Sequence, residues 1–275
     1  MTTLVTGATG NTGRHVVAEL VRRGEAVRAL TRHPDAAAAL LPPEAAVVPG
    51  THTDITTLDG ALDGVDRLHL TATAGLVETG PELVRRAVAA GVRRITVLWG
   101  GYVGPVEQAV AESGVEWTRL EPQEFMSNAL TWVDSVRAEG VVREPFDLPS
   151  AVVHEGDIGA VAAVALLEEG HVGRAYNLTG PEALTTAQRV AMLSAVLGRP
   201  VELVRITREQ AVARLVADGV SRADAEYVIG WHADPPPEAS TPVDTVARVL
   251  GRPARSFADW LAEHADRFDV PRLAS

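Results

Sequence analysis

The chain has 275 residues, of which 46% are hydrophobic, and this content suits one globular domain with a substantial core or one domain with a small appended lobe. The formal net charge of −11 and the absence of a long basic run argue against a nucleic-acid surface. No apolar segment reaches the roughly 20 residues that a membrane helix needs, and no signal peptide is expected. The lack of cysteine excludes disulfides and thiolate metal sites, and we expect a cytoplasmic protein.

The first half of the chain alternates between short apolar runs and stretches with helical apolar spacing. The predicted strands are Thr3–Thr6, Ala26–Thr31, Ala46–Val48, Asp66–Thr71, Arg94–Leu98 and Glu116–Leu120. The predicted helices are Asn11–Arg23, Asp35–Leu41, a stretch near Leu58–Leu62, Pro81–Ala90 and Val106–Glu112. This repeated β-α-β pattern predicts an α/β fold with a doubly wound, parallel sheet of the Rossmann type.

After Leu120 the alternation loosens. We predict helices at Phe125–Arg137, Ile158–Leu167 (entered through Asp157 as N-cap) and Thr186–Leu197, and strands at Ala175–Leu178 and Val201–Ile206. The sheet domain is therefore expected over 1–150, with parts of 151–180 completing the sheet. A small, mostly helical lobe is expected over 181–275.

A glycine-rich stretch, LVTGATGNTGRHVVAEL, joins the first predicted strand to the first predicted helix. In this context its G-x-x-G-x-x-G spacing is typical of a dinucleotide-binding turn, in which the glycines make the turn, admit the pyrophosphate and allow close packing. A glycine turn kept for steric reasons alone is the alternative. A P-loop is excluded because it needs lysine, and all 25 basic residues are arginine. The predicted phosphate-binding residues are Gly7, Thr9, Gly10, Asn11, Thr12 and Gly13.

The end of the second predicted strand indicates which nucleotide would bind. NAD-binding sites usually carry a carboxylate there, about 20 residues beyond the glycines, to hold the ribose hydroxyls. This strand instead ends in ALTRH, which places Arg32 at its tip. Because a guanidinium suits a 2′-phosphate, the sequence predicts NADP(H) rather than NAD(H), unless Arg32 is only a solvated surface residue.

Several segments resemble the NmrA-like, atypical short-chain dehydrogenase/reductases. The opening TLVTGATGNTGRHVVAELVRRGEAVRALTRHP is similar to the start of that family. THTDITTLDGALDGVDRLHLT, VEWTRLEPQEFMSNAL, GDIGAVAAVALL and GRAYNLTGPEALT resemble later segments of it. The resemblance covers nearly the whole chain. It implies an NADP(H)-binding Rossmann domain over 1–150 and a substrate-binding lobe over 181–275.

The resemblance also implies further cofactor contacts. Residues that border the adenine, follow the fourth strand, approach the nicotinamide ribose and flank the nicotinamide are expected at the carboxyl ends of successive strands. These residues are Asp54, Ile55, Thr71, Ala72, Thr73, Trp99, Gly100, Glu121, Pro122 and Gln123.

The catalytic Tyr-x-x-x-Lys dyad of ordinary short-chain reductases is absent. Tyr102 follows the fifth strand, but Val106 stands four residues on and the chain contains no lysine. Tyr102 is the candidate catalytic residue, as a neutral phenol that donates a hydrogen bond to a developing oxyanion. A loop aromatic without a chemical role is the alternative. We expect a substrate pocket that includes Tyr102, Phe125, Met126, His154 and Trp231. No set of residues has metal-ligand spacing.

The sequence thus favours an NADPH-dependent reductase of a quinone, enone or carbonyl in an aromatic or polyketide-like small molecule. The missing dyad leaves two alternatives open: an NADP(H)-binding redox sensor without turnover, and a non-redox cyclase or isomerase on the same scaffold. We expect no nucleic-acid or membrane partner and a monomer or homodimer.

Overall fold

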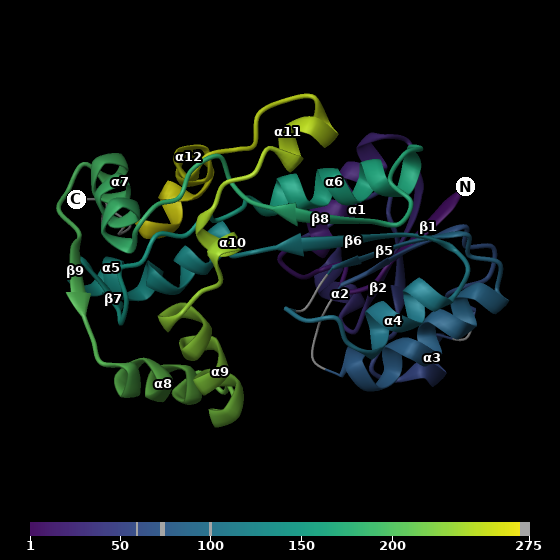
Figure 1. Ribbon diagram of the computed structural model, residues 1–275, viewed down its shortest axis with the longest axis horizontal. Helices are drawn as coiled ribbons and strands as arrows, with labels where there is room; N and C mark the ends of the chain where they lie inside the picture. The colour runs from purple at the N-terminus through teal and green to yellow at the C-terminus, as the bar shows by residue number, and fades with distance from the viewer. Residues whose placement is uncertain (59, 72–74, 99–100, 270–275) are drawn as a thin grey trace. The chain divides into compact units, whose positions relative to one another are not determined.

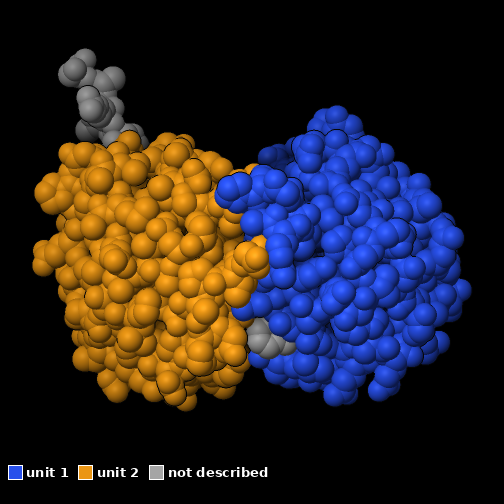
Figure 2. Space-filling model, turned by 45° about the horizontal axis from the view of Figure 1, so that its top comes forward, with its two compact units in different colours: residues 1–122, 155–178, 245–253 blue, residues 123–154, 179–244, 254–275 orange. Residues whose placement is uncertain are grey.

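The computed structural model describes residues 1–58, 60–71, 75–98 and 101–269. It divides into two compact units, coloured separately in Figure 2. Unit 1 comprises residues 1–122, 155–178 and 245–253, and unit 2 comprises residues 123–154, 179–244 and 254–275. The chain thus passes between the units several times. The stretch 123–150, expected in the sheet domain, belongs to unit 2, and 245–253, expected in the lobe, belongs to unit 1.

Unit 1 is a Rossmann-type α/β fold built on one sheet. Its seven strands pair in parallel in the order β3-β2-β1-β4-β5-β6-β8. The strands are β1 (Thr2–Val5), β2 (Ala26–Thr31), β3 (Ala46–Pro49), β4 (Arg67–Leu70), β5 (Arg94–Leu98), β6 (Glu116–Pro122) and β8 (Arg174–Leu178). The chain order reverses between β1 and β4. In such sheets a ligand binds outside the carboxyl ends of the strands at this switch point.

Helices cover both faces of the sheet, as the doubly wound topology requires (Figure 1). In unit 1 they are α1 (Gly13–Arg22), α2 (Pro34–Ala37), the 3₁₀ helix η1 (Ile55–Leu58), α3 (Leu76–Ala89), α4 (Pro105–Glu112), α6 (Glu155–Leu167) and α11 (Thr245–Leu250). Helices α1 and α6 pack together on one face, and α3 and α4 pack together on the other. Because the strands are covered on both faces, every residue of β5 is buried.

Helices α3 and α6 of unit 1 begin at least three residues earlier than the sequence predicts. Helix α3 starts at Leu76, so Pro81, expected as its first residue, lies inside it. Helix α6 starts at Glu155, so the expectation that Asp157 is its N-cap was wrong. Asp157 is fully buried and accepts a 2.7 Å hydrogen bond from Arg252, which explains a carboxylate inside a helix that is apolar almost all round.

Unit 2 is mostly helical and holds a two-stranded parallel sheet of β7 and β9. Its elements are η2 (Met126–Trp132), α5 (Val133–Glu139), β7 (Val141–Glu144), α7 (Thr186–Leu197), β9 (Glu202–Arg205), α8 (Arg208–Ala217), α9 (Arg222–Ala233), α10 (Pro237–Ser240) and α12 (Phe257–Phe268). The predicted helix Phe125–Arg137 is thus a 3₁₀ helix followed by an α-helix, and β7 was not predicted. The hydrophobic core of unit 2 includes a stacked pair, Phe257 and Trp260, with ring centroids 5.6 Å apart.

Candidate functional site

The glycine-rich stretch forms a tight turn between β1 and α1 in unit 1. Gly7 has a φ of +58°, a conformation that side chains with a Cβ rarely adopt. A Cβ on Gly13 would lie 2.1 Å from the carbonyl oxygen of Gly7, so only glycine fits there. The amide of Gly10 closes the turn by donating a 2.9 Å hydrogen bond to the same oxygen. The glycines therefore place no side chain over the backbone where the turn meets the helix.

The amino end of α1 is open to an anion. Thr12 is its N-cap residue, and within the described part of the chain its hydroxyl makes no capping hydrogen bond. The first turn carries no acidic residue. The amides and the dipole at this helix end therefore lack a carboxylate of the protein that would compete with a phosphate. A glycine turn and an uncapped helix end are the features that a pyrophosphate group needs.

The switch point beside this turn is held by paired threonines. Thr71, just after β4, donates a 2.8 Å hydrogen bond from its hydroxyl to the carbonyl oxygen of Thr6, and its amide donates to the Thr6 hydroxyl at 3.0 Å. A Cβ on Gly7 would come 3.1 Å from the Cβ of Thr71. The carboxyl ends of β1 and β4 are thus tied together and packed against the glycine turn.

The ends of β2 and β3 bring two basic side chains together. Arg32 follows β2 and is exposed, whereas His52 follows β3 and is buried. Burial and the nearby Arg32 guanidinium both lower the pKa of His52, which places the two groups within electrostatic reach. Asp54 accepts 2.7 Å and 3.0 Å hydrogen bonds from the hydroxyl and amide of Thr56 at the start of η1. Ile55 packs partly buried against the core of unit 1.

Three of the remaining predicted cofactor residues lie within the described part of the chain and four lie outside it. Glu121 and Pro122 end β6 in unit 1, and Glu121 forms a 2.6 Å ion pair with Arg119. Gln123 is the first residue of unit 2. The predicted contacts Ala72, Thr73, Trp99 and Gly100 lie outside the described residues.

Tyr102 lies between β5 and α4 in unit 1 and is 54% exposed. Its ring packs over the backbone of Gly104, where an added Cβ would lie 2.8 Å from Cε2 of the tyrosine. The phenol is therefore positioned by the turn before α4. An exposed hydroxyl is accessible to a substrate and to water.

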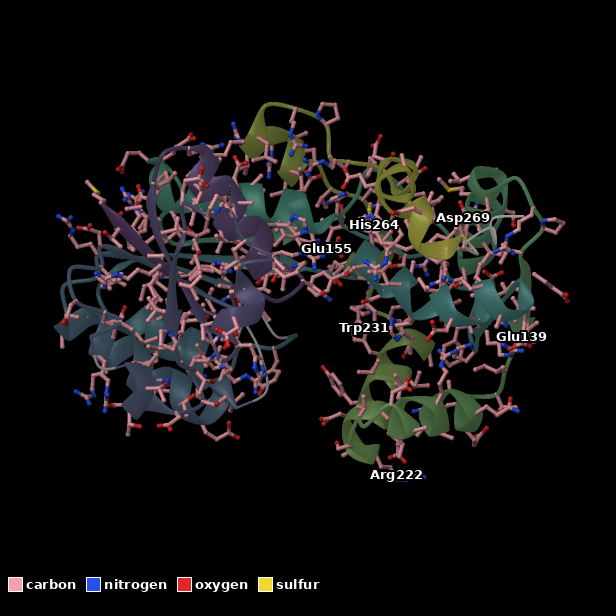
Figure 3. The ribbon with its side chains drawn as sticks, turned by 180° about the vertical axis from the view of Figure 1, so that it is seen from behind. Glu139, Glu155, Arg222, Trp231, His264 and Asp269 are labelled. Atoms are coloured by element: carbon pink, nitrogen blue, oxygen red, sulfur yellow. The ribbon has the colours of Figure 1, made fainter. Side chains whose placement is uncertain are left out.

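Unit 2 contains a cavity of about 280 Å³, near the lower end of the volumes of ligand pockets. Its apolar wall includes Trp132 from η2, Phe146 and Leu148 from the loop after β7, and Ile229 and Trp231 from α9. Figure 3 shows Trp231 at the opposite end of α9 from Arg222. Several aromatic rings in a space of this size suit a flat ligand.

A buried ion pair forms part of the wall of this cavity. Nη1 of Arg189, from α7, lies 3.2 Å from a carboxylate oxygen of Glu124, and both side chains are 8% exposed. Burial by itself would raise the pKa of Glu124, but the Arg189 charge and, more weakly, His232 outweigh it, so the pKa is lowered. The Arg189 guanidinium also stands 5.5 Å from the centre of the Trp132 ring. The lowered pKa favours the carboxylate form of Glu124 beside the guanidinium.

Of the unit 2 residues predicted for the substrate pocket, Trp231 lines this cavity and the other three do not. Met126 is 1% exposed and belongs to the core. His154 is buried, with Nε2 3.3 Å from a Glu263 oxygen. Phe125 forms an isolated bridge with Val153. The cavity residues that sequence reasoning missed come from segments far apart in the chain, and no local motif connects them.

Within the described residues, no group of three or more histidine or acidic side chains could hold a metal ion. No helix in the same part of the chain is long and apolar enough to cross a membrane.

Comparison with known proteins places these features in a family. Residues 7–105 match the family model described as NAD(P)H-binding. The chain is 38% identical to the (4-alkanoyl-5-oxo-2,5-dihydrofuran-3-yl)methyl phosphate reductase of Streptomyces griseus, over 96% of this chain and 98% of that protein. It is 34% identical to the NAD(P)H azoreductase of Xenophilus azovorans, over 96% of this chain and 98% of that protein.

The fold is also that of a solved reductase. The crystal structure of the NADPH-dependent quinone oxidoreductase of Escherichia coli in complex with NADPH superposes with a TM-score of 0.78, at 25% sequence identity, over 96% of this chain and 99% of that chain. The bare glycine turn, the open end of α1 and these similarities agree with one another. The chain belongs to the NmrA-like, atypical short-chain dehydrogenase/reductase family of NAD(P)H-dependent oxidoreductases.

Proposed function

We propose that the protein is an NADPH-dependent reductase of a quinone, enone or carbonyl compound. The observation that carries the proposal is the cradle at the switch point of the sheet, where Gly7 and Gly13 leave the backbone bare beside the uncapped end of α1. Gly7, Thr9, Gly10, Asn11, Thr12 and Gly13 would hold the pyrophosphate. The other predicted contacts would follow the strand ends around it.

We further propose that the nucleotide is NADP(H). Arg32 would pair with the 2′-phosphate. His52, whose pKa is lowered in part by the Arg32 charge, would lie beside that arginine. A guanidinium binds phosphate through two parallel N–H groups, whereas a neutral ribose hydroxyl gains much less from it. The arginine therefore supplies the preference, and the end of β2 carries no carboxylate that would favour NAD(H).

The names of the relatives support the substrate class. The name of the Streptomyces griseus enzyme describes a phosphorylated, unsaturated lactone with an alkanoyl group, in which a C=C bond is conjugated with carbonyl groups. The Xenophilus enzyme is named for azo compounds and the Escherichia coli enzyme for quinones. All three classes are electron-poor conjugated systems. For this chain we propose the quinone, enone or carbonyl members of that group, in an aromatic or polyketide-like molecule.

Such substrates explain how reduction proceeds without a Tyr-Lys dyad. The bound nicotinamide would supply a hydride, and a proton completes the addition. An electron-poor acceptor takes up hydride readily and its product can be protonated by water, so a strong protein acid is not required. The protein would contribute by positioning the reactants and excluding bulk water. Tyr102 would donate a hydrogen bond to the oxygen on which negative charge develops.

The test is NADPH oxidation by the purified protein across a panel of quinones, enones and aromatic ketones, with the Tyr102→Phe variant measured alongside. We expect turnover, and a loss of about tenfold or less in Tyr102→Phe, because one hydrogen bond from an exposed hydroxyl contributes about 0.5–1.5 kcal/mol. A much larger loss would make Tyr102 the proton donor. No turnover with any acceptor, despite tight NADPH binding, would favour the redox sensor or the non-redox enzyme, both of which accommodate the missing dyad.

A further inference from the structure

From the cavity of unit 2 we infer that it binds an uncharged, flat, conjugated carbonyl compound and that Arg189 anchors the carbonyl oxygen. This inference rests on the proposed reductase function, because it names the substrate class and a specificity residue.

The guanidinium of Arg189 has hydrogen-bonding capacity to spare. An arginine carries five N–H donors. The Arg189 side chain is 8% exposed, and within the described chain it donates at 3.2 Å to Glu124 and at a marginal 3.5 Å to Thr186. Its Nε–H has no acceptor among the described residues. Nη1 and Nη2 carry four of the five N–H groups and make one bond each within the described chain, so the guanidinium has donors left for an added oxygen acceptor in the cavity.

The surroundings of Arg189 favour a flat ligand. Its guanidinium lies over the Trp132 ring, and Phe146, Ile229 and Trp231 form part of the apolar wall of the same cavity. Aromatic side chains stabilise a planar conjugated molecule through offset or edge contacts. A ring in the cavity with its carbonyl directed at Arg189 would contact the aromatic walls and accept a hydrogen bond from the guanidinium.

The charges around the cavity argue against an anionic ligand. Three carboxylates line it, Glu124, Glu144 and Asp218, against two guanidinium groups, Arg189 and Arg214, and the imidazole of His232. Each arginine already has a carboxylate near it, at 3.2 Å for Arg189 and 3.6 Å for Arg214. A phosphate or sulfonate would meet these carboxylates beside each arginine, whereas a neutral carbonyl needs only the donor. The pocket therefore differs from one that would select a phosphorylated substrate.

Binding of menadione to the full-length protein without nucleotide, measured by calorimetry, tests the inference. A quinone is a clean probe here because the chain has no cysteine that could add to it. We compare menadione with 2-methylnaphthalene, which has the rings without the carbonyls, and with 1,4-naphthoquinone-2-sulfonate, which keeps the planar quinone and carries a negative charge. We expect menadione to bind about 10–100-fold more tightly than either comparison compound.

The matched variants separate the anchor from general damage. The double variant Glu124→Gln with Arg189→Met removes both charges of the buried pair together, so that no lone charge is left in the interior. We expect it to lose about 10–100-fold in menadione affinity and to keep its affinity for 2-methylnaphthalene. Arg222→Met, whose side chain is 70% exposed on the same unit, is the control and should bind menadione as the unaltered protein does.

Two results would overturn the inference: equal affinity of the unaltered protein for menadione and 2-methylnaphthalene, or unchanged menadione binding in the double variant. Tighter binding of the sulfonate would overturn the uncharged substrate class. The comparison of ligands on the unaltered protein needs no variant, so it tests the inference even if the double variant does not fold. Arg189-dependent binding without NADPH turnover would contradict the proposed function and leave the inference standing. NADPH turnover of menadione without Arg189-dependent binding would support the proposed function and contradict the inference.

Discussion

Gly13 packs so closely on Gly7 that a Cβ atom at position 13 would lie 2.1 Å from the Gly7 carbonyl oxygen and 2.8 Å from its carbonyl carbon. The obstacle is backbone, which cannot rotate away as a side chain could. Gly13→Ala would therefore force α1 away from β1 and widen the turn. We expect a loss of about 3 kcal/mol or more in the free energy of unfolding, measured by urea denaturation, and strongly weakened NADPH binding.

Gly230→Ala is the matched control for this change. Gly230 lies inside α9, and its nearest obstacle is the flexible end of Arg208, at 3.3 Å from the added Cβ. Alanine has the higher helix propensity, so this variant should be neutral or slightly stabilised. If Gly13→Ala were as harmless as Gly230→Ala, the proposed role of the close contact would be wrong.

Arg32→Ala tests the nucleotide preference. Loss of a charged contact with the 2′-phosphate should weaken NADPH binding by about 10–100-fold, because hydrogen bonds to charged groups contribute about 1.5–3 kcal/mol. NADH lacks that phosphate and serves as the internal control, with an expected change of less than about threefold. Dissociation constants from nucleotide fluorescence provide the measurement. An equal loss for both nucleotides would rule out the assignment of Arg32 to the 2′-phosphate.

Arg94→Lys tests why an arginine stands at the start of β5. Its side chain is 10% exposed and bonds Glu116 and Glu169. It also donates at 3.1 Å to the carbonyl oxygen of Leu166, near the end of α6, and at 2.7 Å to that of Glu168, just beyond the helix. A lysine ammonium cannot span this fork, and the buried acceptor on Leu166 would be left unpaired. We expect a loss of about 2 kcal/mol in the free energy of unfolding.

The neighbouring Arg93→Lys is the control for that experiment. The Arg93 side chain is 69% exposed, and its partner is Asp66, at 2.7 Å. Because an exposed ion pair contributes little, we expect a change within about 0.5 kcal/mol in the same urea titration. Equal effects at the two positions would show that the buried carbonyl contacts of Arg94 do not matter.

His69 predicts a pH dependence of stability. The residue is fully buried in β4, and burial lowers its pKa from 6.5 to about 4. Below pH 6.5 the unfolded chain takes up a proton that the folded chain does not take up until about pH 4. The free energy of unfolding is therefore highest above pH 6.5, falls across this window and loses about 3 kcal/mol from this group in total.

The variant His69→Asn removes that titration while retaining a polar group near the Thr96 hydroxyl, which lies 2.8 Å from Nδ1 of the histidine. Its free energy of unfolding should fall less between pH 6.5 and pH 4 than that of the unaltered protein. Parallel pH profiles for His69→Asn and the unaltered protein would contradict the prediction.

Local patterns predicted unit 1 well, because its elements follow one another in chain order. The strand Arg94–Leu98 was predicted with the bounds that the structure has, as was Ala26–Thr31. The start of α3 was misjudged because a proline usually opens a helix, whereas Pro81 is accommodated inside one. The strand β7 was missed because four residues, Val141–Glu144, gain their strand character only by pairing with β9, some 60 positions away.

By itself, the sequence determined the Rossmann-type sheet, the glycine turn and the absence of a Tyr-Lys dyad, because periodicity, spacing and composition are local properties of a chain. Only the tertiary structure decided that Asp157 pairs with Arg252 and that Glu124 pairs with Arg189 in the wall of a cavity. Those partners stand 95 and 65 positions apart. A buried charge needs a counter-charge, but the sequence does not say which one the folding of distant segments will bring to it.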